Sequence, residues 1–133
     1  MEQTKDASQP HIQNRDPKLP VMSRFRAVTE AEVRAHVQAT GRPALVGKMM
    51  MARVGRAKER SETQGFMQIF IDAESKRILG AAILGIGGDE IIHGLLDIMY
   101  ADAPYTVIQR AMHIHPTVSE LIPTMLADLK PLQ

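Results

Sequence analysis

The sequence has 133 residues, 44% of them hydrophobic, which is enough for one compact domain with its own core but not for two. It contains no cysteine, which excludes structural disulfides, thiolate nucleophiles, dithiol redox chemistry and cysteine-ligated zinc. The net charge of +1, with no apolar run near the ~20 residues that span a bilayer, favours a cytoplasmic protein without nucleic-acid or membrane partners.

The N-terminal segment differs in composition from the rest of the chain. Residues 1–22 are polar, punctuated by proline and without a hydrophobic period, so we expect a disordered leader followed by one domain over 23–133. Charge is also uneven: residues 1–60 carry 12 Lys and Arg against 6 Asp and Glu, and residues 61–133 carry 4 against 9. Opposite signs in one small domain favour halves that face each other or a symmetry mate.

The first predicted element is a short amphipathic helix. Thr29 is a suitable N-cap, and Glu32, three residues later, completes a capping box. Gly41 is placed to end the helix as its C-cap.

Strands are predicted next. The segment "PALVGKMMMARVGRA" (43–57) has the content of one or two strands, with Gly47 and Gly55 as bulges or points of close approach. "GFMQIFID" (65–72) and "RILGAAILG" (77–85) alternate in the manner of a β-hairpin around the turn "AESK".

Three helical segments complete the chain. "GIGGDEIIHGLLDIMYA" (85–101) predicts a glycine turn that leads into a helix, and two capping boxes then follow. These boxes are Thr106 with Gln109, and Thr117 with Glu120, where Pro123 must kink or restart the last helix. The order predicts an α+β fold, an antiparallel sheet with helices packed on one face.

The stretch "HIHPTVSE" (113–120) is the principal candidate site. Proline at 116 keeps His115 out of the helical region, so its imidazole is presented at the mouth of a helix. Glu120 could hold one ring nitrogen and raise the basicity of the other, as in acid/base chemistry. Alternatively, Glu120 serves only the capping box of Thr117.

Other motifs favour structural interpretations. "GIGGDE" does not have the spacing of a nucleotide loop, and its acids would repel an anion, so a strand-to-helix turn is favoured. His93, His113 and His115 lack metal-ligand spacing. Adjacent strand side chains point to opposite faces, so Met49–Met51 are predicted to be filler and not a metal site. The basic stretch Arg42–Arg60 lacks interleaved aromatics and is interpreted as a solvated or interface-facing charge run.

Together these motifs carry a resemblance to a known family. "VTEAEV", "ETQGFMQIFID", "RILGAAILGIGGDEIIH" and "HIHPTVSE", in this order, make the segment from about Ala27 to Leu132 resemble the C-terminal dimerisation domain of the pyridine nucleotide-disulfide oxidoreductases. The resemblance implies a homodimer, or pairing with a full-length flavin reductase subunit. It also implies that His115 is an acid/base group acting in the partner's redox site and that Glu120 orients it, whereas His113 is a neighbour without that role.

The resemblance implies FAD and NAD(P)H as cofactors of the parent family. The motifs for binding them and the redox cysteine pair do not occur here, so we expect this chain alone to bind none and to have no turnover. We therefore expect an isolated dimerisation domain. The alternatives are a truncated fragment of an FAD/NAD(P)-dependent oxidoreductase and an independent hydrolase that uses His115.

Overall fold

The computed structural model describes residues 29–133, so the predicted leader (1–22) and residues 23–28 lie outside the described part. The elements in chain order are α1 (Glu30–Thr40), β1 (Ala44–Met50), the 3-10 helix η3 (Met51–Arg53), α2 (Gly55–Glu59), β2 (Phe66–Asp72), β3 (Ile78–Leu84), α3 (Gly88–Tyr100), α4 (Thr106–Gln109), the 3-10 helix η4 (Val118–Leu121), α5 (Ile122–Ala127) and β4 (Lys130–Pro131). Within this part of the chain, no helix is both long and apolar enough to cross a membrane.

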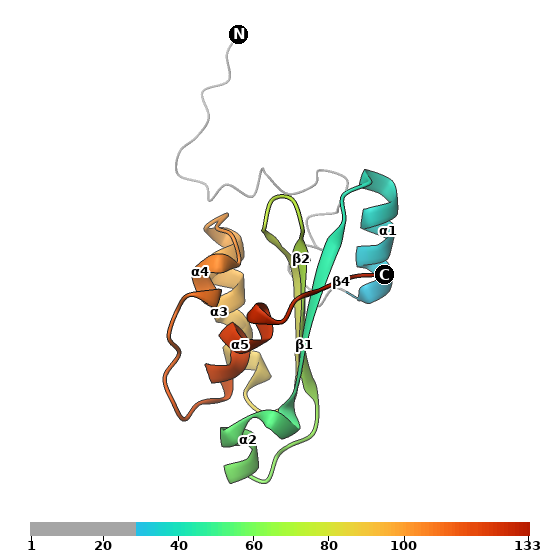
Figure 1. Cartoon of the computed structure of the whole chain (residues 1–133). Coiled ribbons are helices and arrows are strands. Elements are labelled where there is room, and N and C mark those ends of the chain that lie inside the picture. The colour runs from blue at the N-terminus through green and yellow to red at the C-terminus, as the bar shows by residue number, and fades with distance from the viewer. Residues whose placement is uncertain (1–28) are drawn as a thin grey trace.

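The sheet is antiparallel and has the order β3-β2-β1-β4 (Figure 1). β1 and β2 pair from Ala44↔Asp72 to Met50↔Phe66, and β2 and β3 form the predicted hairpin. The predicted α+β class is therefore confirmed. The two-residue strand β4, which pairs with β1, was not predicted, because two residues that include a proline have no strand periodicity.

The two faces of the sheet are covered by different helices. α3, α4 and α5 cover one face, as expected, over a core cluster that includes Met67, Ile69 and Ile71. One helix departs from the predicted single-face arrangement: α1 lies on the opposite face, where Val33 packs with Phe70. The alternation along β2 explains this, because the large apolar ring of Phe70 needs its own cover.

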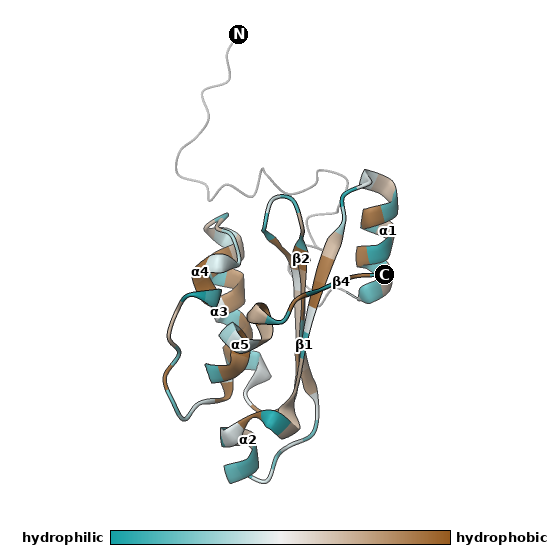
Figure 2. Cartoon of the chain, viewed as in Figure 1, coloured by the Kyte–Doolittle hydropathy of each residue, from teal (hydrophilic) through white to brown (hydrophobic). Residues whose placement is uncertain are grey.

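Hydropathy follows this arrangement. The strands and the helices that cover them carry most of the hydrophobic residues, whereas the short α2 is largely hydrophilic (Figure 2). α1 begins with the predicted capping box of Thr29 and Glu32, and Gly41 ends it in the left-handed conformation. These predictions are confirmed.

Gly47 is a point of close approach, as predicted. A Cβ at this position would lie 2.9 Å from Leu129 Cδ2 and 3.1 Å from the Met125 carbonyl oxygen, so glycine lets α5 lie against β1. The prediction for Gly55 was wrong, because the chain leaves the sheet after Met50 and Gly55 begins α2. A second strand in this segment is absent from the described structure for the same reason.

The methionine run 49–51 contributes to the hydrophobic core, as predicted. Met49 and Met51 are buried in the core cluster, whereas Met50 is 49% exposed. The three side chains therefore do not converge on a common point.

The start of α3 is a strand-to-helix turn, as favoured above. Gly87 is its N-cap with φ 68°, and a Cβ on Gly88 would lie 2.9 Å from the Ile83 carbonyl oxygen. The left-handed backbone at Gly87 and the tight packing at Gly88 therefore account for these two glycines. Leu95 and Met99 of α3 are buried, whereas Ile91, Ile92 and Leu96 are partly buried against the core.

The predicted box at Thr106 was wrong. α4 has only four residues, its N-cap is Tyr105, and this cap makes no side-chain bond. Gln109 donates instead to the Leu126 carbonyl oxygen at 3.3 Å, so a contact with α5 outcompetes the local cap. Met112 lies beyond this helix and is 96% exposed.

Candidate functional site

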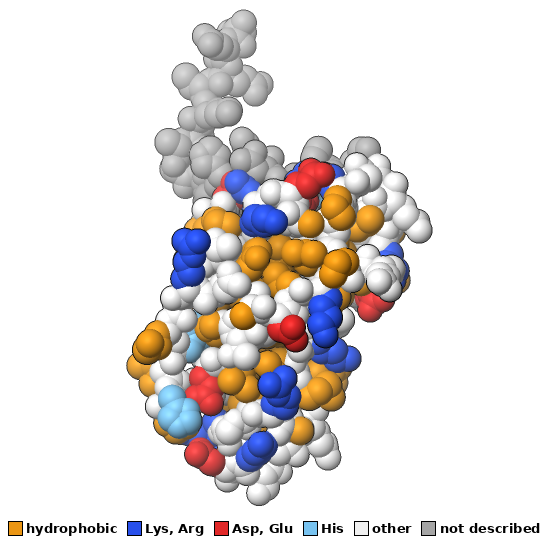
Figure 3. Space-filling model, in the orientation of Figure 1, with side chains coloured by type: hydrophobic (Ala, Val, Ile, Leu, Met, Phe, Trp, Pro, Cys, Tyr) orange, Lys and Arg blue, Asp and Glu red, His pale blue; other side chains and the backbone are white. Residues whose placement is uncertain are grey.

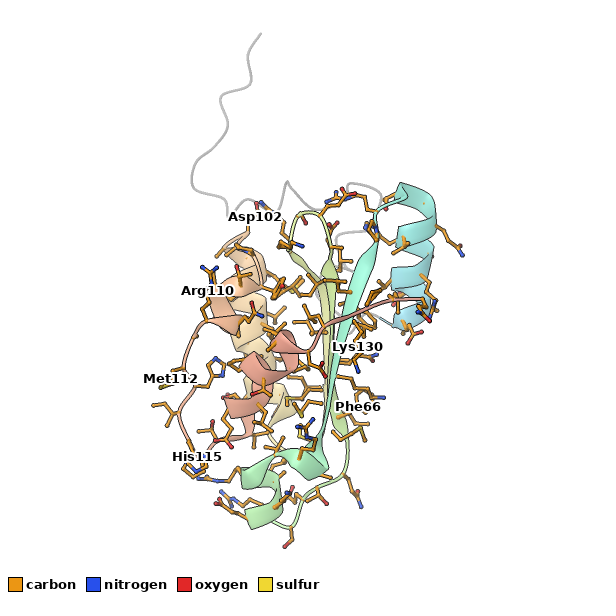
Figure 4. All side chains as sticks on the ribbon, in the orientation of Figure 1. Phe66, Asp102, Arg110, Met112, His115 and Lys130 are labelled. Atoms are coloured by element: carbon orange, nitrogen blue, oxygen red, sulfur yellow. The ribbon has the colours of Figure 1, made fainter. Side chains whose placement is uncertain are left out.

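The site lies on the loop between α4 and η4. His115 exposes 80% of its side chain, and its Nδ1 lies 2.6 Å from Oε2 of Glu120. The Glu120 side chain is only 13% exposed. Figure 4 places His115 at the lower end of this loop, and Figure 3 shows an exposed histidine beside acidic side chains in the same area.

The alternative role of Glu120, a capping box with Thr117, was wrong. Thr117 is the N-cap of η4 but makes no side-chain capping bond. Its hydroxyl donates to the Ile114 carbonyl oxygen at 2.7 Å, and the Glu120 carboxylate lies against His115. The hydroxyl is therefore occupied within the loop, and the carboxylate is available to the imidazole.

Pro123 lies in the first turn of α5 and restarts the helix after η4, as predicted.

This geometry fixes the chemistry available to the imidazole. A carboxylate can only accept a hydrogen bond, so the contact assigns the ring proton to Nδ1 of His115, which donates to Oε2 of Glu120. In a neutral ring Nε2 is then the acceptor, and it can take a proton from an external group. The nearby carboxylate also stabilises the imidazolium that forms.

The other two candidate histidines, His113 and His93, have different surroundings. His113 is partly buried, and its Nδ1 lies 2.8 Å from the Ser119 carbonyl oxygen, whereas His93 is exposed on α3. Among residues 29–133 there is no group of three His, Asp or Glu side chains placed to hold a metal ion. The Ser119 hydroxyl faces Thr117 Oγ1 at 3.4 Å, so this geometry does not favour the hydrolase alternative.

Sequence reasoning missed one residue next to the site. Arg56, on α2, donates from Nη2 to the Pro116 carbonyl oxygen at 2.9 Å, across 60 positions of the chain. The His115–Pro116 peptide bond is cis, which was also not predicted. The only sequence signal for Arg56 was its membership of the basic stretch, which was interpreted as a solvated or interface-facing charge run.

A cavity of about 370 Å³ lies between α3 and the site loop. Its lining includes Glu90 and His113 together with apolar side chains of α3, α4 and α5. His115 and Glu120 are not part of this lining, so the cavity and the exposed imidazole are separate features.

A second carboxylate at the β2–β3 turn is held by many partners. Burial raises the pKa of Asp72, but hydrogen bonds from the backbone N–H groups of Ser75 and Glu74, with the charge of Arg42, outweigh it and leave the pKa below its usual value. Both backbone donors lie 2.9 Å from Oδ1, and Arg42 Nη2 lies 2.8 Å from Oδ2. This carboxylate stabilises the hairpin turn.

The glycine turn before α3 does not form a phosphate site for a nucleotide. Gly88 packs against the Ile83 carbonyl oxygen, and Asp89 and Glu90 occupy the first turn, where a phosphate would be repelled. The sequence has no cysteine for a redox pair.

Comparisons with known proteins identify relatives. Residues 28–126 match the family model "Pyridine nucleotide-disulphide oxidoreductase, dimerisation domain". Dihydrolipoyl dehydrogenase of Corynebacterium glutamicum is 40% identical over 51% of this chain and 14% of its own length. Dihydrolipoyl dehydrogenase 3 of Pseudomonas putida is 31% identical over 77% of this chain and 22% of its own.

A solved structure agrees with this match. The HOCl-induced flavoprotein disulfide reductase RclA from Escherichia coli superposes with a TM-score of 0.69 at 26% identity, covering 76% of this chain and 22% of that chain. This chain thus spans between about one seventh and about one fifth of the length of these relatives. It belongs to the pyridine nucleotide-disulphide oxidoreductase family, of which it contains the dimerisation domain.

Proposed function

We propose that this domain pairs with a second subunit and presents His115, held by Glu120, to the redox site of that subunit. The observation that carries the proposal is an imidazole 80% exposed whose Nδ1 is nonetheless fixed by a mostly buried carboxylate. A histidine that served a site inside its own domain would face that site. His115 faces outward, which fits service to another subunit.

The chemistry proposed for His115 is proton transfer with a thiol. Nε2 accepts the proton of a partner's S–H group, which leaves a thiolate and an imidazolium, and the reverse transfer restores both groups. Glu120 accepts the hydrogen bond from Nδ1 throughout and stabilises the imidazolium. The family uses FAD and NAD(P)H, and electron transfer is assigned to the partner because this chain has no thiol of its own.

Exposed apolar side chains support the pairing. Large hydrophobic residues are exposed at six positions of the described part: Met50, Leu84, Tyr100, Val107, Met112 and Ile114. Two of them, Met112 and Ile114, flank His113 on the site loop. A partner that covered this loop would therefore bury apolar surface beside His115. The partner is a second copy of this chain or a full-length flavin reductase subunit.

A complementation experiment tests the proposal. The chain is mixed with a full-length flavin reductase of the family whose own histidine at the matching position is replaced, and turnover is followed with NADPH. We expect restored turnover with the wild-type chain and a loss of about a hundredfold or more with His115→Ala. His93→Ala, which removes an exposed histidine on α3, is the control. Sedimentation that shows a strict monomer, with no binding to the reductase, would contradict the proposal.

A second candidate is that the chain forms part of a longer or split FAD/NAD(P)-dependent oxidoreductase. The favouring observation is that it spans at most about a quarter of the relatives it matches. Genes for the flavin and nicotinamide domains next to this one would favour a split enzyme. A purified chain that is yellow with flavin and oxidises NADPH alone would contradict both candidates.

A further inference from the structure

The site loop is tied to a distant part of the chain through Arg56. Its Nη2 donates to the Pro116 carbonyl oxygen at 2.9 Å, and its Nε donates to Glu59 Oε2 at 2.8 Å. The guanidinium therefore joins α2 to the peptide group between Pro116 and Thr117, one residue beyond His115. Its fixed planar donors suit such a double contact better than a flexible ammonium.

The helix that carries Arg56 is well anchored. Val54, its N-cap, and Ala57 are fully buried in the core cluster. A Cβ on Gly55 would meet Glu120 Oε1 at 3.6 Å, so the start of α2 also lies against the carboxylate that contacts His115. One short helix thus touches both sides of the His115–Glu120 pair.

The other side-chain hydrogen bonds of this loop are local. His113 bonds the Ser119 carbonyl oxygen, and Thr117 bonds the Ile114 carbonyl oxygen, so both contacts stay within residues 113–120. These bonds shape the loop but do not fix it relative to the sheet. The contact from Arg56 does, because α2 is packed into the core.

We propose that Arg56 is a positioning residue. It holds the Pro116 carbonyl and thereby keeps the imidazole of His115 within hydrogen-bonding distance of Glu120. The proposal deepens the proposed function, on which its catalytic meaning rests. Without Arg56 the Pro116 carbonyl loses its tie to α2, and the backbone around His115 gains freedom to move relative to Glu120. The imidazole then loses its fixed proton position at Nδ1.

The tautomer of His115 is the direct readout. The full chain is labelled with ¹⁵N, and the two ring nitrogens are observed at a pH where the spectrum itself shows a neutral ring. In the wild type we expect a protonated Nδ1 and an unprotonated Nε2, with well-separated shifts. In Arg56→Ala we expect most of this separation to be lost, because both tautomers are populated.

Three further variants make the readout specific. Arg56→Lys, which keeps a donor, should recover part of the separation. Arg56→Met keeps the apolar stem without any donor and replaces the alanine variant if that one does not fold. Lys58→Ala, which removes an exposed charge from the same helix, should match the wild type. Wild-type shifts in both Arg56→Ala and Arg56→Met would overturn the proposal.

The complementation assay separates this proposal from the proposed function. If the wild-type chain restores turnover, Arg56→Ala should lower it about tenfold, because the imidazole is misplaced. If the wild-type chain restores nothing, the proposed function fails, but the tautomer experiment still decides whether Arg56 holds the pair.

Discussion

Two carboxylates at opposite ends of the molecule are held in different ways. Asp72, at the β2–β3 turn, is 3% exposed and accepts from two backbone N–H groups and from Arg42. Glu120, beside α2, accepts from an imidazole that is itself mostly in solvent. Asp72 has partners from its own turn and from the segment before β1, all within the domain, whereas the partner of Glu120 is exposed to solvent.

This difference separates a structural acid from a candidate functional one. A carboxylate surrounded by backbone donors stabilises the local chain and has little left to offer a ligand. A carboxylate that fixes one nitrogen of an exposed imidazole leaves the other nitrogen available for chemistry. Substitutions at the two ends should therefore affect different measurements.

The largest effect is expected for Glu120→Ala. Loss of the acceptor at Nδ1 should reduce restored turnover in the complementation assay by about a hundredfold, because the tautomer is no longer fixed and the imidazolium is less stable. The free energy of unfolding should change by less than about 1 kcal/mol, since the partner is exposed. Equal turnover for Glu120→Ala and wild type would show that Glu120, like Asp72, is not needed for the chemistry of His115.

Asp72→Ala should change the free energy of unfolding but not the restored turnover. Two backbone N–H groups and Arg42 lose their acceptor, which should lower the free energy of unfolding by about 2 kcal/mol in urea denaturation. Restored turnover should stay at the wild-type level at a temperature where both proteins are folded. Glu74→Ala, which removes the exposed, more distant partner of Arg42 at 3.6 Å, is the matched control and should cost less than about 0.5 kcal/mol.

The pH dependence of stability should follow Asp72. Its pKa is lower in the folded protein than in the unfolded chain, where it is about 3.9, so the charged carboxylate stabilises the fold above about pH 4. This contribution is lost as the pH falls through the folded pKa. The gap in unfolding free energy between wild type and Asp72→Asn should therefore be constant from about pH 7 to 5 and narrow below about pH 4. Asp97→Asn, an exposed position on α3, should show no comparable trend.

The smallest effect is expected for Gly55→Ala. A Cβ here would make an ordinary contact with Glu120 Oε1 at 3.6 Å, and alanine favours the helix, so stability should rise by up to about 1 kcal/mol. The His115 tautomer should stay unchanged. A shifted tautomer together with reduced stability would show that Glu120 has no room beside α2.

Local signals predicted much of this fold. Thr29, Glu32 and Gly41 lie within a few residues of one another, and their capping pattern gave the bounds of α1 correctly. The alternation along β2 and β3 gave the hairpin in the same way. These elements depend on short-range geometry, which a sequence displays directly.

Competition among hydrogen-bond acceptors, some of them distant in the sequence, explains the errors. Gln109 matched a capping box but bonds the Leu126 carbonyl oxygen, and Thr117 matched another but bonds the Ile114 carbonyl oxygen. A capping pattern cannot tell which of several acceptors a side chain will use once the helices pack. Arg56 was missed for the same reason, because its partner lies 60 positions away. The His115–Glu120 contact was predicted as one of two alternatives, and its role in catalysis stays a prediction.

Because Met112 is almost completely exposed, its oxidation reports how accessible the site loop is to solvent. A thioether in solvent is readily converted to the sulfoxide, whereas Met51, Met67 and Met125 are sealed in the core. Mild peroxide treatment followed by peptide mass spectrometry therefore measures how freely solvent reaches this loop. Retarded oxidation of Met112 upon mixing with another subunit, with no change at Met50 on the other face of the sheet, would locate the contact next to His115 without any label.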